Sequence, residues 1–78
     1  MLMRSYEGSV GIVHCDLYRL ESEEEAYEAG VIDALTAGDS VCFVEWAGAV
    51  SDVVTADFAV TITIEPDLSR IVTVEQLA

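Results

Sequence analysis

The chain of 78 residues contains no lysine and only three basic residues, Arg4, Arg19 and Arg70, against 15 acidic ones. Its formal net charge is −12. A protein that binds nucleic acid by itself neutralises phosphates with lysine and arginine, so this composition argues against such a function. It argues equally against docking on an anionic membrane surface.

Long apolar runs and metal-binding cysteine motifs are also missing. The apolar runs fall far short of the ~20 residues that a membrane-spanning helix needs. Cys15 and Cys42 have no CxxC spacing and only one histidine beside them. We therefore expect small apolar thiols rather than a disulfide or a zinc site. Residues 1–4 lack the profile of a signal peptide, and together these features predict a reducing, cytoplasmic environment.

What the sequence does contain is apolar residues, which make up 53% of the chain. This content predicts a folded chain despite the charge. The length predicts one small domain, residues 1–78, with a marginal core.

Two apolar runs predict buried strands that each end in an acid. Residues 9–15 are rich in β-branched side chains and precede Asp16, and residues 2–7 form a candidate hairpin partner. Residues 41–46 form the second run, which ends in Glu45 and Trp46.

A helix is predicted between these strands. Ser22 and Glu25 have the spacing of a capping box, and Gly30 is the expected stop. A second short helix is expected over about residues 31–37, ending at Gly38. A strand, a crossover helix and a second strand imply a parallel pair with a right-handed connection.

The C-terminal part predicts an antiparallel hairpin. Residues 58–65 and 70–75 alternate in polarity around a turn at residues 66–69, which is typical of strands exposed on one face. Residues 47–56 fit a short helix or a loop. The fold class is therefore α/β with an antiparallel end.

Asp16 and Glu45 are the first candidate site residues. Ligands of open α/β sheets bind outside the carboxyl ends of the strands, and a strand ending in aspartate is one way to hold Mg²⁺. The alternative is that each carboxylate caps a neighbouring segment or faces water. His14 lies on the same strand face as Asp16, which fits either proton transfer or a structural hydrogen bond.

Other residues also have two interpretations. Tyr18 and Arg19 fit either phosphate orientation or cover of the sheet edge. Trp46 fits either a core position or a ligand contact. The acidic run from Glu21 to Glu28 fits either a solvated helix start or a surface for a basic partner.

Residues 14–20, His-Cys-Asp-Leu-Tyr-Arg-Leu, resemble the HxDLYRL segment of the TsaE (YjeE) family. Residues 41–46 resemble the strand of that family that ends in Glu-Trp. Residues 4–8 and the glutamate-rich helix up to Gly30 also match in order and spacing. The resemblance covers nearly the whole chain.

TsaE proteins are bacterial P-loop ATPases that act with TsaB and TsaD in making threonylcarbamoyladenosine (t6A) beside the tRNA anticodon. The resemblance implies a P-loop NTPase-like mixed sheet, with ATP and Mg²⁺ as cofactors and tRNA contacted only indirectly. It implies that Glu45 is a Mg²⁺ ligand and that Asp16 is the Walker-B-like aspartate. It places Trp46 near the nucleotide, with Ser69 and Arg70 approaching its base or ribose.

The 78 residues contain no Walker A motif, whose lysine grips the phosphates. We therefore expect the C-terminal half of a TsaE domain, from a truncated gene, a mis-assigned start codon or a fragment. Such a half would expose sheet edges and self-associate. Three hypotheses follow: an ATPase component that is inactive alone, a non-catalytic module that binds TsaB and TsaD, and an unrelated α/β domain.

Overall fold

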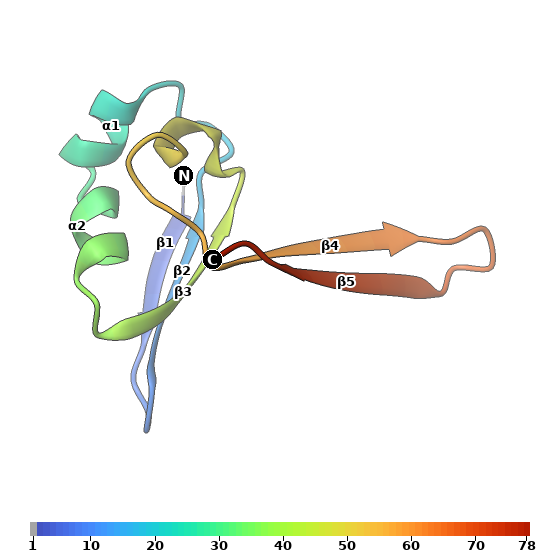
Figure 1. Ribbon diagram of the computed structural model, residues 1–78. Helices are drawn as coiled ribbons and strands as arrows, with labels where there is room; N and C mark the ends of the chain where they lie inside the picture. The colour runs from blue at the N-terminus through green and yellow to red at the C-terminus, as the bar shows by residue number, and fades with distance from the viewer. Residues whose placement is uncertain (1) are drawn as a thin grey trace.

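A mixed three-stranded sheet forms the body of the molecule in the computed structural model, which describes residues 2–78 (Figure 1). Strands β1 (Leu2–Tyr6) and β2 (Gly11–Asp16) are antiparallel, and β3 (Ser40–Glu45) pairs with β2 in parallel. The order is β1-β2-β3. The predicted N-terminal hairpin and the predicted parallel pair are both confirmed.

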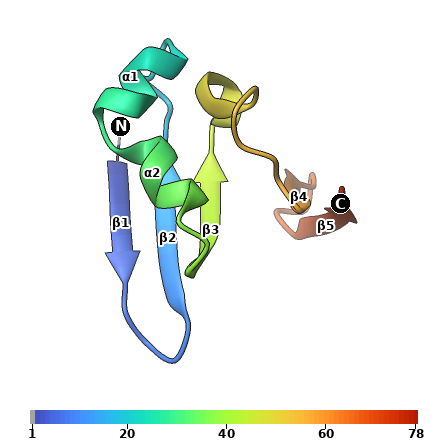
Figure 2. The same ribbon diagram turned by 60° about the vertical axis from the view of Figure 1, so that its left-hand side comes forward.

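Two short helices connect β2 to β3 and cover one face of the sheet (Figure 2). Helix α1 (Glu23–Glu28) begins as predicted, because the hydroxyl oxygen of Ser22 accepts a hydrogen bond from the backbone N–H of Glu25 at 3.2 Å. Gly30 then takes a left-handed φ of +78° and leads into α2 (Val31–Thr36). Within residues 2–78, no helix is long and apolar enough to cross a membrane.

The core lies between these helices and the inner face of the sheet. Alternation along β2 turns Val13 and Cys15 inward, where they meet Ala26 and Val31 from the helices. The segment after β3 contains the 3₁₀-helix η1 (Ala47–Val50), which adds the buried side chain of Val50. Few side chains are fully buried, as the length of the chain predicted.

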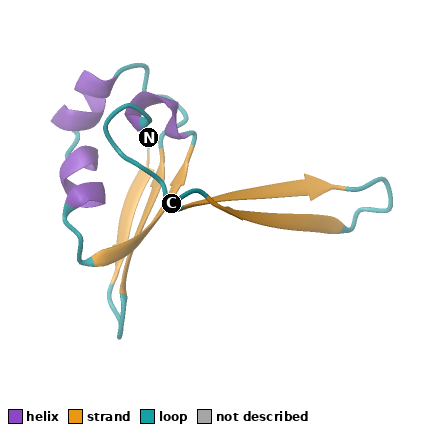
Figure 3. Cartoon of the chain, in the orientation of Figure 1, coloured by secondary structure: helices purple, strands orange, loops and turns teal. Residues whose placement is uncertain are grey.

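The opposite, outer face of the sheet is bare. Alternation along β3 leaves Val41 49% exposed and Phe43 54% exposed. The prediction of a buried strand at residues 41–46 is therefore wrong for this face. Parallel strands are normally covered on both faces, whereas the helices of residues 2–78 cover only one (Figure 3).

The C-terminal strands β4 (Phe58–Ile64) and β5 (Arg70–Gln76) form a separate antiparallel hairpin that projects from the body (Figure 1). Its register pairs Val60 with Val74 and Ile62 with Val72. The hairpin itself was predicted correctly, but the prediction of one buried face is wrong. Both faces are exposed over most of their length, and at the base of the hairpin Phe58 and Val60 line a hollow of about 900 Å³ together with Val41 and Phe43 of β3.

Candidate functional site

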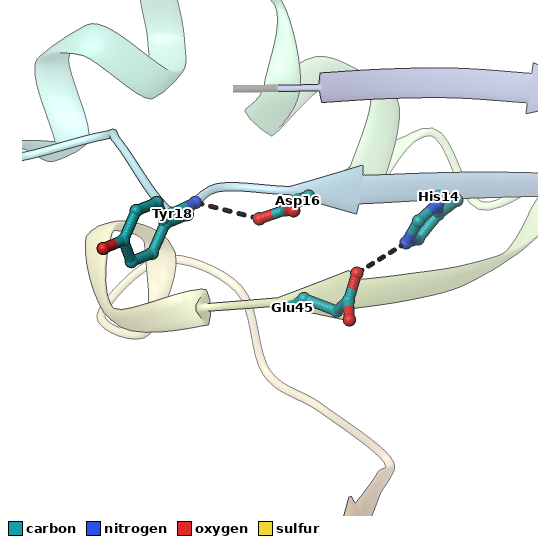
Figure 4. A network of polar contacts seen from close by, with 4 residues as sticks. All are labelled: His14, Asp16, Tyr18 and Glu45. Carbon is teal, nitrogen blue, oxygen red and sulfur yellow. Dashed lines mark hydrogen bonds and ion pairs between the residues drawn. The ribbon is translucent and has the colours of Figure 1, made fainter.

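Asp16 and Glu45 are register partners at the carboxyl ends of β2 and β3. Because they occupy paired positions on neighbouring parallel strands, their side chains emerge on the same, outer face of the sheet. Figure 4 shows both side chains near this edge, with the carboxylate of Asp16 turned toward the backbone of Tyr18 and that of Glu45 turned toward His14. The structure thus brings together the two acids that the sequence singled out.

The carboxylate of Asp16 shapes the turn that follows β2. Its Oδ1 accepts a hydrogen bond from the backbone N–H of Tyr18 at 3.1 Å (Figure 4). This is the local turn closure that short acidic side chains commonly make. One oxygen of Asp16 therefore holds the backbone, and the second is available to a ligand.

Glu45, rather than Asp16, is the partner of His14. The Nε2 atom of His14 lies 3.0 Å from Oε2 of Glu45 (Figure 4). The register places His14 opposite Phe43, two residues before Glu45, so the contact is a diagonal one between strands. Sequence reasoning considered His14 with Asp16 on the same strand and missed this pair. Only the parallel register, which the sequence does not display, reveals it.

An exposed aromatic pair stands at the same edge. The rings of Tyr18 and Trp46 meet edge to face with centroids 5.0 Å apart. Trp46 has a φ of 57°, which is rare for a bulky residue and costs about 1–3 kcal/mol. Trp46 is exposed, so its interpretation as a core residue is wrong. The strained backbone instead presents the indole to solvent beside Glu45.

Arg19 is the basic residue of this edge. It lines a shallow pocket of about 190 Å³ together with Leu2, Asp16 and Tyr18. The pocket combines a carboxylate, a guanidinium and an aromatic ring.

Ser69 and Arg70 lie apart from this cluster, at the end of the hairpin that is remote from the sheet (Figure 1). Ser69 closes the turn there, donating its hydroxyl to Oδ1 of Asp67 at 2.6 Å and its backbone N–H at 3.0 Å. The hydroxyl bond, followed by the backbone bond, lowers the pKa of Asp67. The structure therefore gathers Asp16, Glu45 and Trp46 but does not bring Ser69 and Arg70 to them.

The donor set at this edge suits Mg²⁺ in part. Across residues 2–78, no group of three or more His, Cys, Asp or Glu side chains is arranged to hold a metal ion. Mg²⁺ nevertheless needs only one or two carboxylates when water and phosphate oxygens complete its shell. Asp16 and Glu45 fit that role, and the bound ion would neutralise phosphate charge.

A family model described as "Threonylcarbamoyl adenosine biosynthesis protein TsaE" matches residues 1–72. The chain belongs to the TsaE family. The resemblance carried by residues 14–20 and by the Glu45–Trp46 pair is thereby confirmed, and the hypothesis of an unrelated α/β domain is wrong. The matched range of this TsaE chain includes Asp16, Glu45, Trp46, Ser69 and Arg70.

A curated TsaE relative is also similar to the chain. It is the tRNA threonylcarbamoyladenosine biosynthesis protein TsaE of Rickettsia bellii (strain RML369-C), which is 50% identical over 36 residues. The match covers 46% of this chain and 24% of that protein. The chain thus matches about a quarter of the relative's length. No solved structure matches it significantly.

Proposed function

We propose that this chain acts in t6A biosynthesis as part of an ATPase component, supplying the acidic, Mg²⁺-binding side of the site. The observation that carries the proposal is the register pairing of Asp16 with Glu45 at the carboxyl ends of two parallel strands. Membership of the TsaE family supports the pathway. The Rickettsia relative is also named for tRNA threonylcarbamoyladenosine biosynthesis, which supports the same pathway.

In this proposal each residue of the edge has one task. Glu45 ligates Mg²⁺, and the carboxylate of Asp16 orients the ion or its water from the adjacent strand. Trp46 contacts the nucleotide with its exposed ring. The contribution of Ser69 and Arg70 to the base or ribose requires the hairpin end to approach this edge.

The absent lysine limits what the chain does alone. A P-loop cradles phosphates with a glycine-rich loop and a lysine, and the 78 residues contain neither the motif nor any lysine. The net charge of −12 also repels ATP unless a metal ion offsets it. We expect the chain alone to hydrolyse no ATP.

An ATPase assay with a fluorescence measurement tests the site. Trp46 is the single tryptophan, so its emission reports on the edge directly. In a sample that combines the chain with a polypeptide carrying a Walker A loop, Mg-ATP should change the emission of Trp46, and Glu45→Ala should abolish turnover. The matched control is Glu75→Ala on the hairpin. Turnover by the 78-residue chain alone that depends on Glu45, or emission indifferent to saturating Mg-ATP, would contradict the proposal.

Deletion of the gene tests the pathway separately. Loss of t6A from cellular tRNA, measured by mass spectrometry of nucleosides and restored by the gene but not by its Glu45→Ala variant, is the expected result. Unchanged t6A content would contradict the proposed role of the chain in t6A biosynthesis.

A non-catalytic module that binds TsaB and TsaD homologues is the second candidate. The bare outer face of the sheet favours it, because exposed apolar patches commonly mark protein-binding surfaces. Co-purification with the two homologues, with and without Mg-ATP, separates the candidates. Binding that persists unchanged without nucleotide and in Glu45→Ala supports the module. Binding that requires nucleotide supports the ATPase component.

A further inference from the structure

Tyr18 is the residue that connects the carboxylate edge with the exposed tryptophan. Its backbone N–H donates the 3.1 Å hydrogen bond to Oδ1 of Asp16 (Figure 4). Its ring meets the indole of Trp46 edge to face, with centroids 5.0 Å apart and an angle of 64° between the planes. Aromatic pairs favour this arrangement, because the positive edge of one ring faces the negative face of the other. Tyr18 thus touches both a candidate Mg²⁺ ligand and a candidate nucleotide contact.

The turn that carries Tyr18 is attached to both parallel strands. Leu17, directly before it, is buried and donates its backbone N–H to the carbonyl oxygen of Glu45 at 3.0 Å. Leu20 donates its N–H to the carbonyl oxygen of Leu17, also at 3.0 Å, and closes the turn. The turn therefore continues β2 and is bonded to the end of β3, directly before Trp46. These bonds fix the backbone from which the ring of Tyr18 reaches the indole.

Trp46 depends on such a neighbour for a defined orientation. Its side chain is exposed, and its φ of 57° is a backbone conformation that bulky residues disfavour. A strained conformation persists only where surrounding contacts favour it. The edge-to-face contact with Tyr18 is one such contact. It restricts the direction in which the indole points.

We propose that Tyr18 is the positioning residue of this site. Its backbone N–H holds Asp16 and its ring holds the indole of Trp46, so the Mg²⁺ side and the nucleotide side are set relative to each other before a ligand binds. Groups ordered in advance bind more tightly, because their freedom is not lost on binding. The inference rests on the proposed function, since it takes Asp16 as a group that serves the ion and Trp46 as the ring that contacts the nucleotide.

Time-resolved fluorescence anisotropy of Trp46 tests the ring contact in the chain alone, without metal or nucleotide. Tyr18→Leu removes the ring and keeps the backbone N–H, so the amplitude of nanosecond indole motion should increase. Tyr18→Phe should restore the wild-type amplitude. Tyr27→Leu, at an exposed tyrosine of α1, is the matched control and should leave the amplitude unchanged. Circular dichroism checks that the variants fold, and unchanged indole motion in Tyr18→Leu overturns the inference.

Two variants of Asp16 test the bond to the backbone of Tyr18. Asp16→Asn keeps an oxygen that accepts the N–H and removes the charge, whereas Asp16→Ala removes the acceptor. Indole motion of Trp46 should therefore increase in Asp16→Ala and stay at the wild-type amplitude in Asp16→Asn. If the two variants behave alike, the bond does not control the indole, and the inference is overturned.

Binding of Mg-ATP separates a positioning role from a merely structural one. In the sample that combines the chain with a polypeptide carrying a Walker A loop, calorimetry should give a Kd for Mg-ATP that is roughly three- to tenfold higher for Tyr18→Leu, the effect of losing one edge-to-face contact. KM for ATP should rise by a similar factor while kcat changes little, because the ring acts on binding and not on the reacting phosphate. Tyr18→Phe should restore both constants.

The outcomes distinguish this inference from the proposed function. Unchanged Kd and KM in Tyr18→Leu, together with loss of turnover in Glu45→Ala, overturn the inference and do not contradict the proposed function. A wild-type sample that binds no Mg-ATP overturns both.

Discussion

The Nε2 atom of His14 and the Oε2 atom of Glu45, on adjacent parallel strands, lie 3.0 Å apart. The two side chains are 34% and 61% exposed, so solvent screens their attraction. Glu45 is therefore held in position without being buried. In the proposed function, Glu45 would exchange its histidine partner for the metal ion.

Replacing His14 should have little effect on stability. We expect His14→Ala to lower the free energy of unfolding by less than about 1 kcal/mol, as is typical of an exposed pair. Urea denaturation of the wild-type chain and the variant measures this difference in the free energy of unfolding. Leu17→Ala serves as the contrast, because this side chain is 1% exposed and its removal should cost about 2–5 kcal/mol. Equal losses for the two variants would show that the pair has a structural role that its exposure does not indicate.

Local signals in the sequence predicted the elements well. Ser22 caps α1 because the hydroxyl and the Glu25 N–H are three residues apart, a relationship written into the chain itself. Gly30 ends the helix because its backbone must become left-handed. Such features need no partner from elsewhere in the fold.

Burial and cross-strand contacts could not be predicted in the same way. The apolar character of Phe43 predicted burial, but burial depends on whether another layer covers that face. His14 and Glu45 are 31 residues apart in the sequence, so their pairing depends on the register of two strands that the chain order does not display. The left-handed backbone of Trp46 has no signal in its residue type, since bulky side chains disfavour it.

The two cysteines should differ in reactivity towards thiol reagents. Cys15 is fully buried, and burial, then the charge of Cys42, raises its pKa. Cys42 is half-buried, with its pKa raised by burial and then by Asp39. Because the thiolate is the reactive form, both should react slowly at pH 7, with Cys42 reacting first. Mass spectrometry of the labelled chain over time measures the order.

The raised thiol pKa values also predict how the stability of the fold depends on pH. A raised folded-state pKa stabilises the fold below the unfolded thiol pKa, and this contribution is lost as pH rises through the folded value. Because Cys15 is fully buried, a reagent should reach it only when the chain unfolds, so its labelling should accelerate in denaturant. Cys42→Ser isolates the Cys15 signal. Rapid labelling of Cys15 in the folded chain would contradict the buried position.

Replacing Leu68 with glycine should stabilise the turn of the hairpin. Its φ is 69°, in the left-handed region, and its side chain is 76% exposed. A non-glycine residue there costs roughly 1–2 kcal/mol, so Leu68→Gly should raise the free energy of unfolding by about 1 kcal/mol after the added chain entropy is subtracted. Leu68→Ala removes the side chain and keeps the strain, so it should give no such gain. A decrease in stability for Leu68→Gly would show that the leucine side chain stabilises the turn.

Ser69 should control the ionisation of Asp67 at the end of the hairpin. Its hydroxyl and backbone N–H hold the pKa of that carboxyl below its ordinary value. Removing the hydroxyl in Ser69→Ala should move the pKa of Asp67 back towards that value, followed by the carboxyl chemical shift during an NMR titration. A lowered folded-state pKa adds stability above the unfolded pKa, and this is lost as pH falls through the folded value. The variant's loss of stability should therefore appear at pH 7 and vanish in acid.

Ser51→Ala is the control for this prediction. It removes a hydroxyl bonded to the carbonyl of Gly48 and should leave the pKa of Asp67 unchanged. An unaltered titration of Asp67 in Ser69→Ala would contradict the prediction and would show that the backbone bond alone lowers the pKa of Asp67.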